Sequence, residues 1–204
     1  MATEVEATAT VGPGSGLVPY RLTVRQYLKI IDAGVFPYDA RVELLGGVLA
    51  AKMTKYAPHN FAIFALGENL RSLVPAGWLV REEKSVVLGR FWRPEPDIAV
   101  VRGPDDRYRT NDPARPDLDL LIEVADSSYV PDRGVKWRAY AAAGVPVYWI
   151  VNLPLRQVEI YTIPGGRGKS AAYRDCVTFG AGDEAPVVVG GKEVGRVGVK
   201  DILP

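Results

Sequence analysis

The sequence is poor in the residues on which several common kinds of site depend. It contains one cysteine, Cys176, and one histidine, His59, among 204 residues. A single cysteine excludes an intramolecular disulfide and any multi-cysteine zinc site. A single histidine excludes metal sites built from several histidines. Low cysteine use also favours a reducing, intracellular compartment.

Signals for export or membrane insertion are also missing. Residues 1–16 show neither the basic nor the apolar segment of a secretory signal, and no apolar run approaches the ~20 residues of a membrane helix. A soluble, cytoplasmic protein is therefore expected. The net charge of +1 argues against a strongly basic surface throughout, but it is compatible with a local basic cleft.

The chain length predicts one domain with a substantial core. Residues 1–18, which are small, polar and contain Gly and Pro, are expected to form a flexible N-terminal arm before a single domain over 19–204. Helices are predicted over 22–34, with Thr23 and Gln26 as a capping box, and over 58–77 and 132–143. The apolar face of the second helix is expected to comprise Phe61, Phe64, Leu66, Leu70, Leu73 and Val74.

The rest of the chain shows mainly β patterns. A hairpin over 41–53 is expected to turn at Gly46 and Gly47. The sequence GGRGKS at 165–170 lacks the spacing of a phosphate-binding loop and indicates a glycine-rich hairpin tip. The fold class is therefore α/β (α+β mixed), with a central mixed sheet flanked by helices and extra C-terminal strands. Strands are expected at 78–83, 85–89, 97–103, 118–125, 145–153, 157–163, 171–179 and 186–199.

Two acids interrupt strands that are otherwise apolar. Asp97 precedes the run IAVV, and Glu123 lies within LLIEVA. Buried carboxylates are costly unless they are paired or bind a metal, and hard oxygen ligands suit Mg²⁺ or Mn²⁺. The alternative is that each acid lies at a strand end, where it is solvated or forms a salt bridge.

A lysine follows on the third predicted helix. Asp132 and Lys136 share one helical face at a spacing of four residues, and the short loop after Glu123 can bring Lys136 near the strand end. A lysine there could stabilise negative charge during attack on phosphorus, whereas the alternative is an exposed ion pair. His59 is expected to cap the second helix or to lie on the surface, with a place in a site as the other possibility.

These residues occur in a recognisable order. The segments RPEPDIAVV, LLIEVADSS and DRGVKWRAYAAAGVPVYWIVN resemble the Uma-type family of restriction endonucleases, which is assigned to the PD-(D/E)xK nuclease superfamily. RVELLGGVLAAKM and APHN extend the resemblance upstream, so that it covers residues 20–160. Three departures from the family pattern are Asp126, Val147 and Asn152.

The resemblance implies a restriction-endonuclease-like core and Mg²⁺- or Mn²⁺-dependent hydrolysis of phosphodiesters in nucleic acid. It implies that Asp97, Glu123 and Glu43 hold the metal, that Lys136 orients or helps to deprotonate the attacking water, and that Asp132 positions Lys136. A catalytically silent domain that binds nucleic acid or a protein is the alternative. DNA is the expected partner, and a homodimer is compatible with the superfamily. An arginine-rich loop between the two acidic strands, expected to lie beside the site, could contact phosphates: Arg102, Arg107, Arg109 and Arg115. A merely solvated loop is the alternative.

Overall fold

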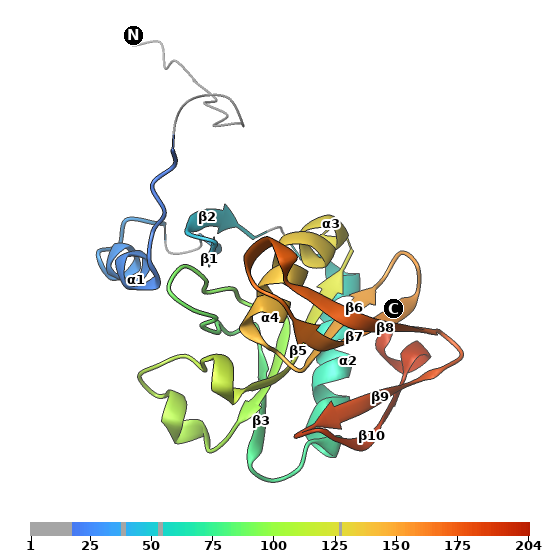
Figure 1. Cartoon of the computed structure of the whole chain (residues 1–204). Helices are drawn as coiled ribbons and strands as arrows, with labels where there is room; N and C mark the ends of the chain where they lie inside the picture. Colours follow the sequence, from blue (N-terminus) through green and yellow to red (C-terminus); the bar gives the residue numbers. More distant parts are fainter. Residues whose placement is uncertain (1–17, 38–39, 53–54, 127) are drawn as a thin grey trace.

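The computed structural model describes residues 18–37, 40–52, 55–126 and 128–204. Residues 1–17 of the predicted flexible arm lie outside this part. A sheet of six strands forms the centre of the domain (Figure 1), with the order β3-β4-β5-β6-β7-β8. The strands are β3 (Trp78–Glu82), β4 (Ile98–Arg102), β5 (Leu118–Ala125), β6 (Val147–Asn152), β7 (Gln157–Gly165) and β8 (Ala172–Gly180).

The sheet is mixed, as the sequence predicts. β5 and β6 pair in parallel, and the other neighbouring strands pair antiparallel. A parallel pair requires a crossover, which here is helical: α3 (Tyr129–Pro131), a π-helical turn (Asp132–Lys136) and α4 (Trp137–Ala143). The helix ends at Gly144, whose φ of 75° suits a glycine.

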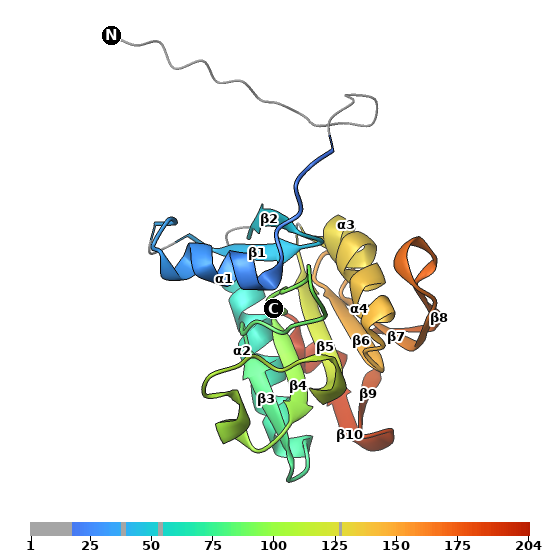
Figure 2. The ribbon, with the colours of Figure 1, turned by 60° about the vertical axis from the view of Figure 1, so that its left-hand side comes forward.

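Each face of the sheet is covered by a different set of elements. One face packs against α2 (Ala57–Leu73) and the C-terminal hairpin of β9 (Glu184–Val189) and β10 (Lys192–Gly198). The other face packs against α4 and the segment around Val86 and Leu88. Figure 2 shows α2 on one side of the sheet and α3 and α4 on the other. All eight residues of β5 are buried, because both of its faces are covered.

A smaller unit lies at one end of the sheet. It consists of α1 (Val24–Asp32) and the hairpin of β1 (Val42–Leu45) and β2 (Val48–Ala51), side by side in both ribbon views. The predicted capping box of Thr23 and Gln26 is present. Gly46 and Gly47 turn the hairpin with φ values of 62° and 86°, which glycine adopts at little cost.

Three predictions of local structure were wrong. Phe61 and Phe64 are exposed, and the buried face of α2 is made instead of smaller residues together with Leu66 and Leu70. Residues 85–89 form only isolated bridges rather than a strand. The third helix begins at Tyr129, because Pro131 is compatible with a first helical turn. The tip at 165–170 is a short turn between β7 and β8, as expected.

Candidate active site

The two acids of the neighbouring strands meet at one end of the sheet. Asp97 directly precedes β4, and Glu123 is the sixth residue of β5. Ile98 pairs with Ile122 in the antiparallel register, so Asp97 and Glu123 follow as cross-strand neighbours. Both are buried, with exposed fractions of 3% and 2%. The acids are therefore not solvated strand ends, but the salt bridges of that alternative are present: Asp97 pairs with Lys55 and Glu123 pairs with Lys136.

Asp97 is surrounded by hydrogen-bond donors. Its Oδ2 accepts a hydrogen bond of 2.7 Å from the backbone N–H of Val124 and lies 3.3 Å from His59 Nε2. Its Oδ1 accepts a hydrogen bond of 2.5 Å from Lys55 Nζ. Burial raises the pKa of Asp97, but His59 and Lys55 outweigh burial and hold this pKa well below its usual range. Asp97 is therefore an anion at neutral pH.

Glu123 has fewer favourable partners. Lys136 Nζ donates to its Oε2 at 3.0 Å, and the Tyr140 hydroxyl donates to its Oε1 at 2.6 Å. Burial raises the pKa of Glu123 to about 8 against the opposing charge of Lys136, and three neighbouring carboxyl groups raise it further: Asp132, Asp97 and Glu43. Glu123 therefore resists ionisation where Asp97 does not.

Lys136 lies among carboxylates from three elements. Its Nζ is 3.5 Å from Asp132 Oδ1 and 3.7 Å from Glu43 Oε1, in addition to the contact with Glu123. Burial lowers the pKa of Lys136, but these carboxylates raise it more, so the ammonium keeps its proton. The predicted pair of Asp132 and Lys136 is present, but it is buried rather than exposed.

The backbone around Asp132 and Lys136 is not regular α-helix. Residues Asp132–Lys136 form one π-helical turn, a feature that occurs often at functional sites. The Tyr148 hydroxyl donates to the Asp132 carbonyl at 3.1 Å, and the Ser128 hydroxyl donates to the Asp132 carboxylate at 2.6 Å. These two bonds fix Asp132 from the sheet and from the preceding loop.

Glu43 belongs to the β1–β2 hairpin, which lines the cavity together with the crossover helix. Its Oε2 accepts a hydrogen bond of 3.1 Å from the backbone N–H of Glu95, and its exposed fraction is 6%. The hairpin therefore adds a buried carboxylate to those that the strands and the crossover helix contribute to the cavity.

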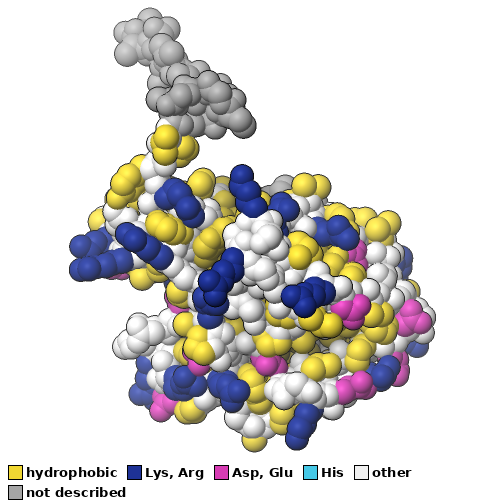
Figure 3. Space-filling model, in the orientation of Figure 1, with side chains coloured by type: hydrophobic (Ala, Val, Ile, Leu, Met, Phe, Trp, Pro, Cys, Tyr) yellow, Lys and Arg dark blue, Asp and Glu magenta, His cyan; other side chains and the backbone are white. Residues whose placement is uncertain are grey.

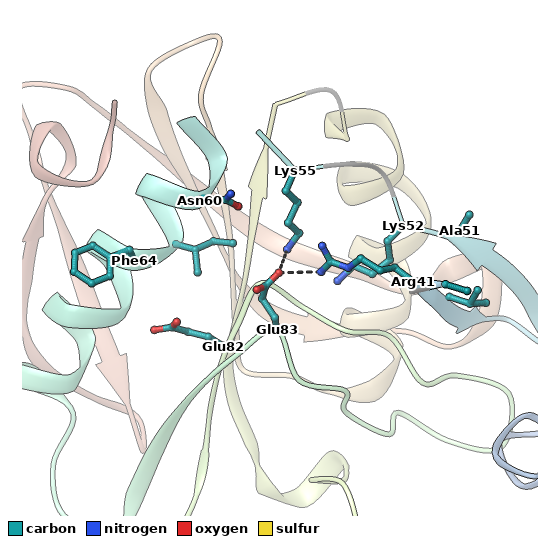
Figure 4. A pocket seen from close by; sticks show the side chains of 11 residues that line it. Arg41, Ala51, Lys52, Lys55, Asn60, Phe64, Glu82 and Glu83 are labelled. Carbon is teal, nitrogen blue, oxygen red and sulfur yellow. Dashed lines mark hydrogen bonds and ion pairs between the residues drawn. The ribbon is translucent and has the colours of Figure 1, made fainter. Parts of the chain in front are cut away.

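Lys55 connects the site to a groove at the surface. Its Nζ also donates to Glu83 Oε1 at 2.6 Å, and Arg41 binds the same oxygen at 2.9 Å. Figure 4 shows both cations pointing to the Glu83 carboxylate, with Asn60 and Phe64 of α2 on the other wall. Lys55 thus lies between the buried Asp97 and an open groove.

A cavity of about 160 Å³ collects these groups. Its lining includes five carboxyl groups, three lysines and His59. Asp132 Oδ1 is buried there without a hydrogen-bond partner among the described residues. The acids are Glu43, Asp97, Glu123, Asp126 and Asp132, and the lysines are Lys52, Lys55 and Lys136.

This donor set fits a divalent cation in its chemistry. Carboxylate oxygens are the ligands that Mg²⁺ and Mn²⁺ prefer, and the cavity collects five carboxyl groups. One of them, Asp132, has an oxygen that accepts no hydrogen bond among the described residues. Within the described ranges, no three Asp, Glu, His or Cys side chains are already arranged around one metal position, because the ammonium groups of Lys55 and Lys136 lie between the carboxylates.

The structure brings together all five residues of the sequence-predicted site. Asp97, Glu123, Glu43, Asp132 and Lys136 line one cavity. Their proximity follows from the register of β4 and β5, from the short loop into the crossover helix, and from the hairpin that lies beside them.

The arginine-rich loop is not beside this cavity, so that expectation was wrong. It joins the end of β4 to the start of β5, and both acids lie at the opposite end of these antiparallel strands. Arg107 pairs with Asp117 at 2.8 Å, and Arg115 Nε donates to the Ala143 carbonyl at 3.0 Å. Two of the loop arginines therefore have structural partners.

Sequence reasoning missed three contacts of the site. His59 is buried and contacts Asp97, so the expectation of a cap or surface residue was wrong. Lys55 was not singled out, because no helical or strand pattern connects it with Asp97. Tyr140 was not assigned to the site, but its hydroxyl donates a hydrogen bond to Glu123. A buried acid that requires donors was the only available signal for all three.

Comparisons with known proteins agree with this architecture. A solved structure from Anabaena variabilis, described as a putative nuclease belonging to DUF820, superposes with a TM-score of 0.64 at 17% sequence identity. The match covers 89% of this chain and 97% of that chain, and at this identity it shows the shared fold. No functionally curated protein matches the sequence significantly. In the described part of the chain, no helix is long and apolar enough to cross a membrane.

The sequence itself identifies the family. The family model Uma2, described as "Putative restriction endonuclease", matches residues 24–190. This range contains the whole cavity and the central sheet with the crossover helix. The chain therefore belongs to the Uma2 family.

Proposed function

We propose that the protein is a divalent-metal-dependent endonuclease that hydrolyses phosphodiester bonds in nucleic acid, with DNA as the substrate. The observation that carries the proposal is the buried cluster in which carboxylates from the hairpin, from β5 and from the crossover helix surround Lys136. Burying several acids and a lysine is costly for folding. An electrostatic role in catalysis accounts for this cost, and membership of a family described as restriction endonucleases supports it.

Asp97, Glu123 and Glu43 would hold the metal, which is Mg²⁺ or Mn²⁺. The chemistry that such an ion supplies when bound is Lewis-acid polarisation of a phosphoryl oxygen. Asp97 suits this role because it is already ionised and is fixed by the Val124 N–H. Asp132 Oδ1 offers an additional oxygen that lacks a hydrogen-bond partner among the described residues.

The protein's own groups would bind the phosphate and stabilise the transition state. In hydrolysis, water forms a new bond to phosphorus and the bond to one sugar oxygen breaks, while negative charge grows on the phosphoryl oxygens. Lys136, which keeps its proton, would stabilise that charge. Asp132 would hold Lys136 in place through the contact of 3.5 Å. Lys55 would bind a phosphate next to the scissile one, from the wall that the cavity shares with the groove.

The decisive experiment measures metal binding and cleavage in the same protein samples. Calorimetric titration with Mn²⁺ should give saturable binding that Glu123→Gln abolishes, and with Mg²⁺ the natural protein should cleave plasmid DNA whereas Glu123→Gln should not. Glu159→Gln is the matched control, because Glu159 is a buried glutamate (4% exposed) of the same sheet outside the cavity. It should leave both signals intact.

Two results would count against the proposal in different ways. If Glu123→Gln binds Mn²⁺ as well as the natural protein does, Glu123 is not a metal ligand and the predicted ligand set is wrong. Binding of DNA and of Mn²⁺ without any cleavage would favour the alternative, a catalytically silent domain that binds nucleic acid through the same cavity. A homodimer remains a proposal, and sedimentation analysis of the free protein tests it.

A further inference from the structure

The outer surface beside the crossover helix carries many cations and few acids. Two neighbouring grooves, of about 640 and 730 Å³, share Arg21 in their lining. Neither groove is lined by any Asp or Glu among the described residues. Their five basic side chains are all exposed, and together they form what we call the basic surface: Arg21, Arg25, Arg90, Arg138 and Lys169.

The charge of this surface is not neutralised within the described part of the chain. None of the five side chains forms an ion pair there with Asp or Glu. Arg21 and Arg90 lie instead over the ring of Phe91, at 4.3 and 5.2 Å from its centroid. A ring contact orients a guanidinium without cancelling its charge. In Figure 3, Lys and Arg side chains are numerous over the region of α1 and α4, whereas acidic side chains gather toward the right-hand edge.

The basic surface and the cavity are built on the same elements. Lys136 and Arg138 are two residues apart on the crossover helix, and a rotation of about 200° places them on opposite sides of it. Lys136 lines the cavity, and Arg138 lines the outer groove. The hairpin shows the same division, because Glu43 lines the cavity while the Gly46 carbonyl accepts a hydrogen bond of 2.7 Å from Arg21 Nε.

We propose that the basic surface binds the phosphate backbone of the nucleic-acid substrate next to the bond that is cut, an inference that rests on the proposed endonuclease function. The crossover helix, about 10 Å across, lies between the groove that Arg138 lines and the cavity that Lys136 lines. The contacted phosphates would therefore belong to nucleotides that flank the scissile one. Contacts of this kind fix the register of the substrate and do not select a base sequence.

The test compares two double variants of the full chain with equal changes in charge. Arg25→Glu with Arg138→Glu alters the basic surface. Lys192→Glu with Lys200→Glu alters two exposed lysines near the β9–β10 hairpin, away from α1 in Figure 1. Each pair lowers the net charge from +1 by four units, to −3. Arg25 lies in the first turn of α1, where an acid is favourable for the helix, so the fold should persist.

Binding is measured by fluorescence anisotropy with a labelled DNA duplex in EDTA, over a range of salt concentrations, so that cleavage does not contribute. The variant of the basic surface should bind at least about 10-fold more weakly, with a salt slope reduced by about 2, because two phosphate contacts are lost. The control pair should stay within about 3-fold of the natural protein. Equal weakening in both pairs, or no DNA binding by the natural protein, would overturn the proposal.

Two further measurements separate this inference from the proposed function and from other anionic partners. If the control and the surface variant cleave plasmid equally well while Glu123→Gln is inactive, the endonuclease function stands and the basic surface has no role in binding. If the surface variant loses DNA binding but no protein cleaves, the surface stands and the proposed function falls. If the protein binds phosphatidylserine vesicles in preference to DNA, the basic surface binds a membrane, and the proposal that it binds nucleic acid is wrong.

Discussion

Asp97 and Glu123 are neighbouring carboxyl groups of one cavity, but their pKa values shift in opposite directions. On one side, Asp97 receives a backbone N–H, a lysine and the histidine, and its pKa falls below the usual range. On the other side, Glu123 shares its lysine with further acids, and its pKa rises to about 8. Burial is nearly equal for both, so the difference comes from the ratio of donors to acids around each carboxylate.

This contrast suggests that the two carboxyl groups have different roles, one in stability and one in the response to metal and pH. Asp97 is a preformed anion that needs no partner beyond those in the fold, and its donors contribute to stability. In the free protein, the ionised form of Glu123 is poorly stabilised, because acidic neighbours repel it. A bound cation would offset this repulsion, so the Glu123 carboxylate would be stabilised most by an added cation. The Asp97 side should therefore govern folding, and the Glu123 side should respond to metal and pH.

The largest effect is expected from Asp97→Asn. The substitution removes the charge that Lys55 and His59 face and leaves their donors with a poorer acceptor. The free energy of unfolding at pH 7 in EDTA should fall by about 3 kcal/mol, as is typical when one partner of a buried ion pair is removed. Urea titration measures this loss.

The control for that substitution is Asp119→Asn. Asp119 is also buried, but it accepts a single hydrogen bond, from Gly190 N–H at 2.6 Å, and it is absent from the cavity. Its loss should cost about 1 kcal/mol. Similar costs at both positions would show that the donors around Asp97 do not stabilise its charge.

A smaller effect per pH unit, with a distinct pH dependence, is expected from Glu123→Gln. The folded-state pKa of Glu123 is raised to about 8 from the usual 4.5, so the stability that its protonated form contributes is complete below pH 4.5 and is lost as the pH rises to 8. Glutamine cannot ionise. Relative to the natural protein, Glu123→Gln should therefore gain about 1.4 kcal/mol per pH unit between pH 5 and pH 8 in EDTA.

Urea titrations of both proteins at the two pH values give this difference directly. Glu159→Gln again serves as the control, because it replaces a buried glutamate outside the cavity. A constant difference between natural protein and Glu123→Gln across this range would mean that Glu123 is ionised throughout, as Asp97 is. The comparison between the two carboxylates would then fail.

The sequence was sufficient for the acidic half of the site and insufficient for most of its donors. Asp97 and Glu123 are easy to recognise, because each is a carboxylate beside or within a run of apolar residues that predicts a strand. Helical spacing after a short loop brings Asp132 and Lys136 near the strand end, but the family resemblance was needed to assign them, and Glu43, to the site. His59 lies in the first turn of α2, and Lys55 lies just before that helix. Both are distant from Asp97 in the chain, and only the packing of α2 against the sheet brings them to it.

The errors in the fold have a similar origin. Strands paired deep in the sheet were predicted because apolar residues dominate them, whereas α2 contains Phe61 and Phe64 on a face that pattern alone assigns to the core. The structure buries small residues there instead, such as Ala62 and Ala65, because the helix packs closely on the sheet. The arginine loop shows that neighbours in sequence can lie at opposite ends of a strand pair.

The smallest effect is expected from Tyr140→Phe, which removes one hydroxyl from the Glu123 side. The hydroxyl donates to Glu123 Oε1 at 2.6 Å and is fully buried, while the ring packs against Tyr148 at 4.9 Å between centroids. Phenylalanine keeps the ring, so the free energy of unfolding should fall by about 1 kcal/mol, the usual contribution of one hydrogen bond.

Tyr173→Phe, which removes a hydroxyl that donates to the Val145 carbonyl at 3.0 Å, is the matched control for stability. If Tyr140 positions Glu123, only Tyr140→Phe should also weaken Mn²⁺ binding in calorimetry, by several-fold. Equal Mn²⁺ affinity in both variants would limit Tyr140 to packing and would leave Lys136 as the donor that orients Glu123.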